Sequence, residues 1–456
     1  MGQCRLHRPA IETALSSPTH EKDIPESPAS EAADQGTARR SWRPLDALLR
    51  LRTFEAIRYR EYRLIWFGQI FATTATWMDQ VARGWLIYEL TNSAFQLGLV
   101  RGIQAIPLLL LSPVAGSTAD RYSRKLQLIA TQVADGLLYA TLALLILTDQ
   151  IQPWQVYATA VGMAFVQTFQ QPSRVSLIAD AVPSDHLTNA IGLNAIVFNV
   201  ARIVGPALAG ILIAMFGTGS SYTIQAVFYF LATIWTVRLR PTQRSAGSPH
   251  GRSAPGDSLG KSIIEGWKFS WRNEAVRVAL LIAFLAALFI APVVTLLPVF
   301  ARDFLGVGAT GQGLLLTSMG LGALCSSFLI ASLGDKMPRG IIMIGGVALY
   351  GLIVVAFSAS SWFELSMVLM GIMGLCHVTS HALVQTVIQA YSPSEFRGRT
   401  SSIFQMSRVV LMVGSMVIGS LSAVVGAQWA VSLMSITGVL TIVIIYVALP
   451  RVRQIR

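Results

Sequence analysis

The chain has 456 residues, of which 53% are hydrophobic and only 13% carry charge. Soluble domains carry charge on about 25% of their residues, so this composition excludes an ordinary water-soluble globule. The formal net charge of +12 is spread over loops and tails and lacks the basic stripe that nucleic-acid binding requires. The cysteines lie far apart at Cys4, Cys325 and Cys376, which predicts neither a metal site nor a disulfide framework.

Twelve apolar runs follow a polar segment, 1–53, which is predicted to be a disordered cytoplasmic tail. Each run is close to the ~20 residues that cross about 30 Å of hydrocarbon as a helix. We expect two six-helix halves, 54–239 and 263–450, joined by a cytoplasmic linker at 240–262 and followed by a basic cytoplasmic tail at 451–456. The predicted spans lie near 62–90, 94–119, 126–148, 153–178, 188–216, 220–239, 275–300, 311–333, 340–359, 362–391, 399–424 and 428–449.

Lysine and arginine are concentrated in alternate loops. Basic residues occur at 121–125, 238–244, 336–339 and 397–399, and the loops between these contain almost none, with Arg302 as the exception. Because positively charged loops stay in the cytoplasm, both termini are predicted to be cytoplasmic.

The two halves repeat a charged loop motif. Gly116, Asp120, Arg121, Arg124 and Lys125 close the second run, and Asp335, Lys336 and Arg339 occupy the same place after the eighth. A second pair, Pro183-Ser-Asp185 and Pro393-Ser-Glu395, follows at nearly the same separation. The order indicates two parallel repeats with a solute path between them.

The Gly116 to Lys125 motif resembles the loop signature between helices 2 and 3 of the major facilitator superfamily, with Ser123 in place of a glycine. The resemblance covers 55–450 and implies an all-α integral membrane fold with twelve transmembrane helices in two pseudo-repeats. Tyr59 to Trp66, Gly84-Trp85-Leu86 and Glu265-Gly266-Trp267 resemble bacterial exporters of the enterobactin-exporter and macrolide-efflux type. This implies a multi-pass protein of the bacterial inner membrane.

The charged loops are predicted to form a conformational latch between the halves. The carboxylate of Asp120 is expected to meet the N-terminal end of helix 11, where the helix dipole is positive, or the side chain of Arg174. Such a contact would favour the outward-open state and break as the halves rock. The predicted latch comprises Gly116, Asp120, Arg121, Arg124, Lys125, Arg174, Asp335, Lys336 and Arg339.

In the fifth span, Gly205, Pro206 and Gly210 resemble the antiporter motif of drug exporters, with Ala201 and Ala209 at positions where glycine is common. The alternative is an ordinary close contact between helices through small residues. The fourth span lacks the arginine that drug–proton antiporters often carry in its first half.

Ionisable residues at membrane depth are candidates for proton coupling because their insertion costs about 3 kcal/mol. Asp79 and Arg83 lie four residues apart, which places them on one helix face as a coupling or a purely structural pair. Asp135 is a proton-carrier candidate or a member of an interhelical hydrogen bond. His377 and His381 have a metal-ligand spacing but no third ligand nearby, so we expect no metal; His377 is a protonation or a packing residue.

Other polar and aromatic residues in the spans are candidates for a substrate path. They are Trp77, Gln132, Gln167, Asn199, Arg202, Gln385 and Arg408. Arg101 is instead expected to extend outward to the membrane surface.

These features favour a secondary active transporter, a proton-coupled exporter of a small amphiphilic compound such as a drug or siderophore. The alternatives are an uncoupled facilitator or importer, or a membrane sensor on the same fold. The sequence has no P-loop motif, no cofactor signature and no nucleophile–base pair in its spans, so we expect no enzyme. The expected partners are the small-molecule substrate, the lipid bilayer and protons, with no nucleic acid, and the protein is expected to be a monomer.

Overall fold

A computed structural model describes residues 52–112, 122–240, 259–333 and 338–448. These residues belong to one compact unit, 46–456. Almost all of the predicted N-terminal tail, most of the predicted linker and the basic C-terminal tail lie outside the described residues. The same holds for five members of the predicted latch, namely Gly116, Asp120, Arg121, Asp335 and Lys336.

The N-terminal elements are helices with recognisable start and stop signals. Asn92 ends α2 in a left-handed conformation, and Pro153 begins α6 beside a capping box formed by Gln152 and Gln155. α3 continues as helix to Ser112 after a break at Gln104. The elements are η1 (Arg52–Arg58), α2 (Arg60–Thr91), α3 (Ala94–Ile103), α5 (Arg124–Leu147), α6 (Pro153–Asp180), η2 (Ser184–His186), α7 (Leu187–Phe216) and α8 (Thr218–Val237).

The C-terminal elements include one broken helix. Pro292 and Pro298 lack a backbone N–H, and the predicted span 275–300 accordingly changes from α to π and 3₁₀ geometry along its length. The elements are α9 (Leu259–Arg272), α10 (Glu274–Leu285), η4 (Ala286–Ile290), η5 (Ala291–Leu296), α11 (Leu297–Val299), η6 (Phe300–Phe304), α12 (Gly308–Leu333), α13 (Arg339–Ala359), α14 (Phe363–Tyr391), α15 (Ser394–Gln405), α16 (Ser407–Val425) and α17 (Ala427–Ala448).

Nine helical segments within the described residues are long and apolar enough to cross a membrane. α2, α6 and α8 are equally long but are more polar, and they are not among these nine. The predicted number of twelve spans therefore stays a prediction. α9 begins at Leu259, inside the range predicted as linker, and Met406 separates α15 from α16 inside the predicted span 399–424.

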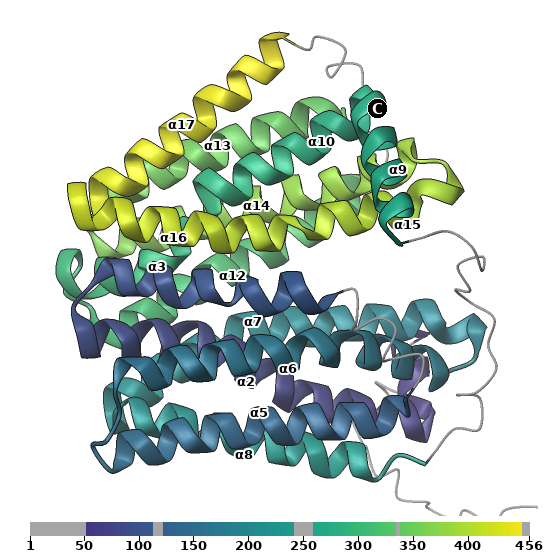
Figure 1. The fold of residues 1–456 in the computed structure, drawn as a ribbon, viewed down its shortest axis with the longest axis vertical. Coiled ribbons are helices and arrows are strands. Elements are labelled where there is room, and N and C mark those ends of the chain that lie inside the picture. Colours follow the sequence, from purple (N-terminus) through teal and green to yellow (C-terminus); the bar gives the residue numbers. More distant parts are fainter. Residues whose placement is uncertain (1–51, 113–121, 241–258, 334–337, 449–456) are drawn as a thin grey trace, which may run out of the picture. The chain divides into compact units, whose positions relative to one another are not determined.

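Helices of each half pack mainly with one another. α2 contacts α7 and α8, and α5 contacts α6 and α8, while α14 contacts α10, α12 and α13. The two sets meet chiefly where α7 lies along α12 and α3 lies along α16 (Figure 1). Both contacts therefore join the N-terminal to the C-terminal helices.

Glycines bring these two pairs of helices close together. A Cβ atom on Gly98 would lie 2.5 Å from the carbonyl oxygen of Ser415, and one on Gly313 would lie 2.5 Å from that of Pro206. Hydroxyl groups of α12 add bonds to the backbone of α7, with Thr317 Oγ1 donating to the Ile203 carbonyl at 2.8 Å. These contacts use the beginnings of α3 and α12 and the later parts of α7 and α16. They therefore lie toward one end, here called the Gly426 end, whereas α9 and α15 lie together at the other, the α9 end (Figure 1).

Candidate functional site

A cavity of about 460 Å³ lies between α2, α3, α6 and α16 and is here called the central cavity. α2 contributes Asp79 and Gln80, α3 contributes Arg101, and α16 contributes Arg408. The lining extends to Ser112, at the end of the helical stretch that follows α3, and to Pro172 in α6. Because side chains of both halves line it, a bound solute would contact both.

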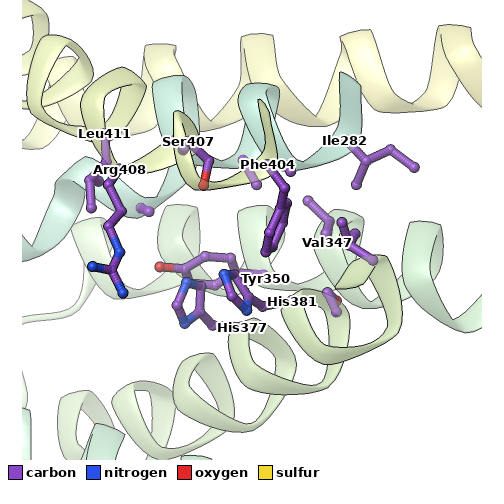
Figure 2. Close-up of a pocket in the computed structure, with 15 residues that line it drawn as sticks. Ile282, Val347, Tyr350, His377, His381, Phe404, Ser407, Arg408 and Leu411 are labelled. Carbon is purple, nitrogen blue, oxygen red and sulfur yellow. The ribbon is translucent and has the colours of Figure 1, made fainter. Parts of the chain in front are cut away.

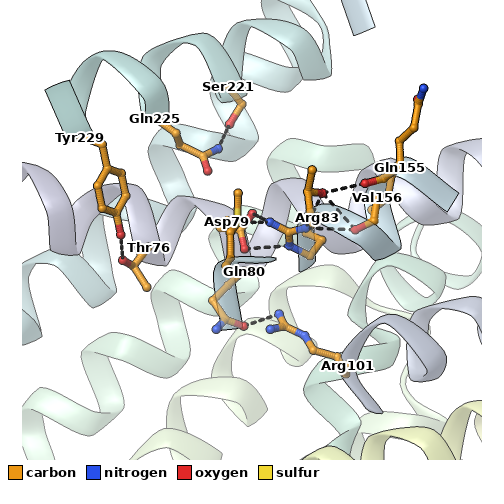
Figure 3. A network of polar contacts seen from close by, with 12 residues as sticks. Thr76, Asp79, Gln80, Arg83, Arg101, Gln155, Val156, Ser221, Gln225 and Tyr229 are labelled. Carbon is orange, nitrogen blue, oxygen red and sulfur yellow. Dashed lines mark hydrogen bonds and ion pairs between the residues drawn. The ribbon is translucent and has the colours of Figure 1, made fainter. Parts of the chain in front are cut away.

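Asp79 and Arg83 form a buried ion pair with two hydrogen bonds (Figure 3). Arg83 Nε donates to Asp79 Oδ2 and Arg83 Nη2 to Asp79 Oδ1, each at 3.0 Å. The arginine is 1% exposed, and its remaining donor atoms point to the Val156 carbonyl, Thr159 Oγ1 and Met163 Sδ. The pairing expected from the i,i+4 spacing is therefore present, with Asp79 also lining the central cavity.

Asp135 is fully buried within the N-terminal half and does not line the central cavity. Gln170 Nε2 donates to its Oδ2 at 3.3 Å, and the described residues offer it no ion-pair partner. Tyr139, one turn further along α5, packs against Tyr229 with ring centroids 5.4 Å apart. The hydroxyl groups of Tyr229 and Thr76 lie 3.1 Å apart, and Thr76 lines the central cavity (Figure 3). A polar connection thus leads from the cavity into the tyrosine cluster beside α5.

Arg101 does not extend to the membrane surface as predicted. Its Nη2 donates to Gln80 Oε1 at 2.5 Å, and both side chains line the central cavity (Figure 3). The prediction was wrong because Gln80, on the neighbouring helix, provides an acceptor within reach. Within the described part of the chain, Arg101 forms no ion pair.

A second cavity, of about 210 Å³, lies inside the C-terminal half and is here called the C-half cavity. Figure 2 shows His377 and His381 entering it from α14 and Arg408 from α16. The two histidine rings lie 6.0 Å apart, and His377 also packs against Tyr350 at 5.5 Å. The buried Nδ1 of His377 has no hydrogen-bond partner among the described residues. Arg408 lines both cavities and so lies between them.

The structure brings only part of the predicted substrate path together. Gln167 and Arg408 line the central cavity, whereas neither cavity includes the other five residues. Arg202 lies over the ring of Trp77, 5.6 Å from its centroid, and Asn199 Nδ2 donates to the Ala195 carbonyl of its own helix at 2.9 Å. The remaining two are Gln132, which is buried in α5, and Gln385, which is exposed on α14.

The glycines of the predicted helix 5 motif serve close packing. A Cβ atom on Gly205 would lie 2.7 Å from Cβ of Trp77 on α2. One on Gly210 would lie 2.7 Å from the Ala309 carbonyl oxygen on α12. Pro206 lies inside α7, which continues through it. This geometry agrees with the small-residue contact, and an antiporter role stays a prediction.

A cluster that the sequence did not predict joins the halves at the Gly426 end. The hydroxyl of Tyr88 donates to a carboxylate oxygen of Asp303, and Arg302 Nη1 donates to Asn92 Oδ1 at 2.9 Å. The Arg302 guanidinium also lies 5.6 Å from the centre of the Tyr88 ring. We call these four residues the Tyr88 cluster. The only sequence signal was Arg302 itself, a basic residue in a set of loops that otherwise contain almost none.

The described members of the predicted latch form local contacts. Arg174 donates to Gln171 Oε1, and Lys125 Nζ donates to the Leu239 carbonyl at 2.5 Å. Arg124 forms a 2.6 Å ion pair with Asp180, a residue that sequence reasoning did not single out. Arg339 is described, but the acidic residues that define the latch are not, so the latch stays a prediction. No group of three or more potential metal ligands was found among the described residues.

The family model for transmembrane secretion effectors matches residues 52–455. The chain belongs to this family of major facilitator transporters. It is therefore an all-helical, multi-pass membrane protein, and the resemblance inferred from the Gly116 to Lys125 motif is confirmed.

Curated relatives of this family member are bacterial transport proteins. The Staphyloferrin A transporter of Staphylococcus aureus is 24% identical over 383 residues, covering 81% of this chain and 91% of the relative. The multidrug efflux pump Tap of Mycobacterium tuberculosis is 26% identical over 346 residues, covering 75% and 81%. Macrolide efflux protein A of Streptococcus pyogenes is 22% identical over 353 residues, covering 76% and 86%.

Solved structures of major facilitator transporters share the fold. A bacterial homologue of the human lysosomal transporter Spinster has a TM-score of 0.66 and 16% identity, covering 87% of this chain and 96% of its own. The D323A mutant of the nucleoside transporter NupG has a TM-score of 0.68 and 12% identity, covering 85% and 99%. At these identities the likeness concerns the fold alone.

Proposed function

We propose that this protein is a proton-coupled exporter of a small amphiphilic compound, a drug or a siderophore, working by alternating access. The observation that carries the proposal is the central cavity, because its lining combines Asp79 and Arg101 of one half with Arg408 of the other. A solute bound there has contacts that change when the halves rock, which is what couples binding to a conformational change. The efflux relatives support the outward direction.

The arrangement of the halves supports one of the two states of such a cycle. The glycine contacts of α3 with α16 and of α7 with α12 hold the halves together toward the Gly426 end. The Tyr88 cluster adds hydrogen bonds across the same end. We assign the α9 end to the cytoplasm of a bacterial inner membrane because the basic loops belong to that end. The cavity is then closed toward the outside, and the Asp120 latch would act at the other end in the opposite state.

Asp135 is the residue that we propose carries the proton. Both carboxylate oxygens of Asp79 already accept hydrogen bonds from Arg83. Asp135 is fully buried, accepts a hydrogen bond from the neutral amide of Gln170 and has no ion-pair partner among the described residues. The pair of hydroxyl groups on Thr76 and Tyr229 offers a route toward the central cavity.

Accumulation measurements in an efflux-deficient bacterial strain test the proposal. Cells producing the protein are loaded with a macrolide, an amphiphilic dye or a siderophore, each with and without a protonophore. We expect lower accumulation of at least one compound and loss of that effect with the protonophore. Lower accumulation that survives the protonophore would contradict proton coupling. Equal accumulation of every compound with and without the protein would contradict export.

A further inference from the structure

The charges that face the two cavities do not balance. Arg101 and Arg408 line the central cavity, and Arg408, His377 and His381 line the C-half cavity. Asp79 is the acidic residue in these two linings. Both of its oxygens accept hydrogen bonds from Arg83, so it is already neutralised.

Arg101 and Arg408 are therefore available to pair with a negatively charged ligand. Within the described residues neither forms an ion pair, and Arg101 donates a hydrogen bond to the neutral amide of Gln80. A cation in a confined cavity with low-dielectric walls raises the local concentration of anions. The guanidinium group also presents paired N–H donors that match the two oxygens of a carboxylate.

The rest of the C-half cavity suits an apolar group with a few polar atoms. Its wall includes Ile282, Val347 and Phe404, which would contact a hydrocarbon or aromatic body. Three buried polar atoms in or beside it lack a partner among the described residues, namely Tyr350 Oη, His377 Nδ1 and Ser380 Oγ. Pockets of this kind bind a ligand mainly through apolar contacts, and a small number of polar groups fix the orientation of the ligand.

We infer that the cargo is an amphiphilic acid. Its carboxylate binds Arg408, with Arg101 facing it across the central cavity, and its apolar body enters the C-half cavity. This inference rests on the proposed function, because it names the chemical class of the compound that is exported. It excludes a simple lipophilic cation as the preferred cargo.

A binding experiment tests the charge preference without requiring transport. Purified protein in a neutral detergent is titrated by calorimetry with 1-naphthylacetate, 2-(1-naphthyl)ethanol and 2-(1-naphthyl)ethylamine. These probes share one ring system and differ in the terminal group. We expect the carboxylate to bind at least about tenfold more tightly than the alcohol, and the ammonium compound most weakly, since charge-assisted bonds are the stronger ones.

Three variants locate the preference. Arg408→Gln should reduce the advantage of the carboxylate over the alcohol to near unity, and Arg408→Lys should keep part of it because the charge remains. Arg60→Gln is the matched control. Arg60 is an exposed arginine that pairs with Glu61 and lines neither cavity. The alcohol reports whether each variant still folds and binds the apolar body.

The outcomes separate this inference from the proposed function. A carboxylate that binds no better than the alcohol, whether both bind or neither does, overturns the inference but leaves the accumulation result untouched. An unchanged preference in Arg408→Gln also overturns it. Conversely, carboxylate selectivity without any export in cells would support the site and contradict the exporter. Competition by lysophosphatidylglycerol in a further titration would support the anion site with a lipid as a second source of the acidic group.

Discussion

The interior of the N-terminal half and the cavity of the C-terminal half differ in whether basic side chains have an acidic partner. In the N-terminal half, Arg83 is 1% exposed and bonds Asp79 through two nitrogen atoms. In the C-terminal half, His377, His381 and Arg408 face a cavity with no acidic residue in its lining. A buried charge that is paired within the protein stabilises the structure, whereas an unpaired charge that faces a cavity is available to bind a ligand.

The comparison also explains why two arginines, Arg83 and Arg408, have different roles. A buried ion pair offsets the cost of desolvating both partners only when geometry is good, and the 3.0 Å bonds of Asp79 with Arg83 meet that condition. Arg408 lines two cavities and forms no ion pair among the described residues. The first arrangement should be sensitive to mutation through stability, and the second through binding.

The largest expected effect is on the buried pair. Asp79→Asn should destabilise the protein by about 3–5 kcal/mol because it leaves the Arg83 charge buried and unpaired. Thermal unfolding in detergent measures the loss, and Asp79→Asn combined with Arg83→Gln should recover part of it. The control is Glu61→Gln, which breaks an exposed pair with Arg60 and should change little. Equal small effects in both pairs would contradict the comparison.

A smaller effect is expected where the halves meet through glycine. Gly98→Ala places a Cβ atom 2.5 Å from the Ser415 carbonyl oxygen, and overpacking of this kind costs about 1–3 kcal/mol. The halves should separate at the Gly426 end, which lengthens the distance between spin labels on cysteines at exposed positions Asp149 and Ser361.

Gly345→Ala is the control for this substitution. Gly345 lies in α13, and a Cβ atom there meets nothing within 4 Å. Alanine favours a helix over glycine by about 1 kcal/mol, so a change confined to Gly98→Ala reports the contact and not the helix. An unaltered spin-label distance in Gly98→Ala would mean that this contact does not hold the halves together.

The smallest expected effect concerns the Tyr88 cluster. Tyr88→Phe removes one hydrogen bond to Asp303 but leaves the bond from Arg302 to Asn92 in place, so it should shift the same spin-label distances less than Gly98→Ala does. Tyr157→Phe is matched, since its hydroxyl bonds Gln96 within one half. The cluster has no role in closing this end if both substitutions give the same distances.

Local spacing predicted some contacts well. The i,i+4 relation was enough to predict that Asp79 meets Arg83, because a helix fixes the positions of both. Hydropathy placed most helix ends within a few residues, although α12 begins at Gly308 and the broken helix extends to Phe304. Helix formation and local pairing depend on neighbours in sequence, so they could be predicted.

The cavity linings could not be predicted in the same way. Lipid and protein interior both accept apolar residues, so hydropathy does not tell which face of α14 or α7 meets the path. Gln385 and Asn199 were therefore placed on the path although neither lines a described cavity. The Tyr88 cluster was missed for another reason. Its partners are far apart in sequence, and the π-helical turn that carries Arg302 and Asp303 changes their direction.

The most direct test of the account compares two substitutions, one in each half, in proteoliposomes with an imposed pH gradient. The measured quantities are uphill transport and exchange at equal pH of the compound identified in cells. Asp135→Asn should abolish uphill transport and keep exchange, because cargo binding does not use it. Arg408→Gln should lose both, because cargo no longer binds. The same defect in both variants, or uphill transport that persists in Asp135→Asn, would contradict the division of roles between the halves.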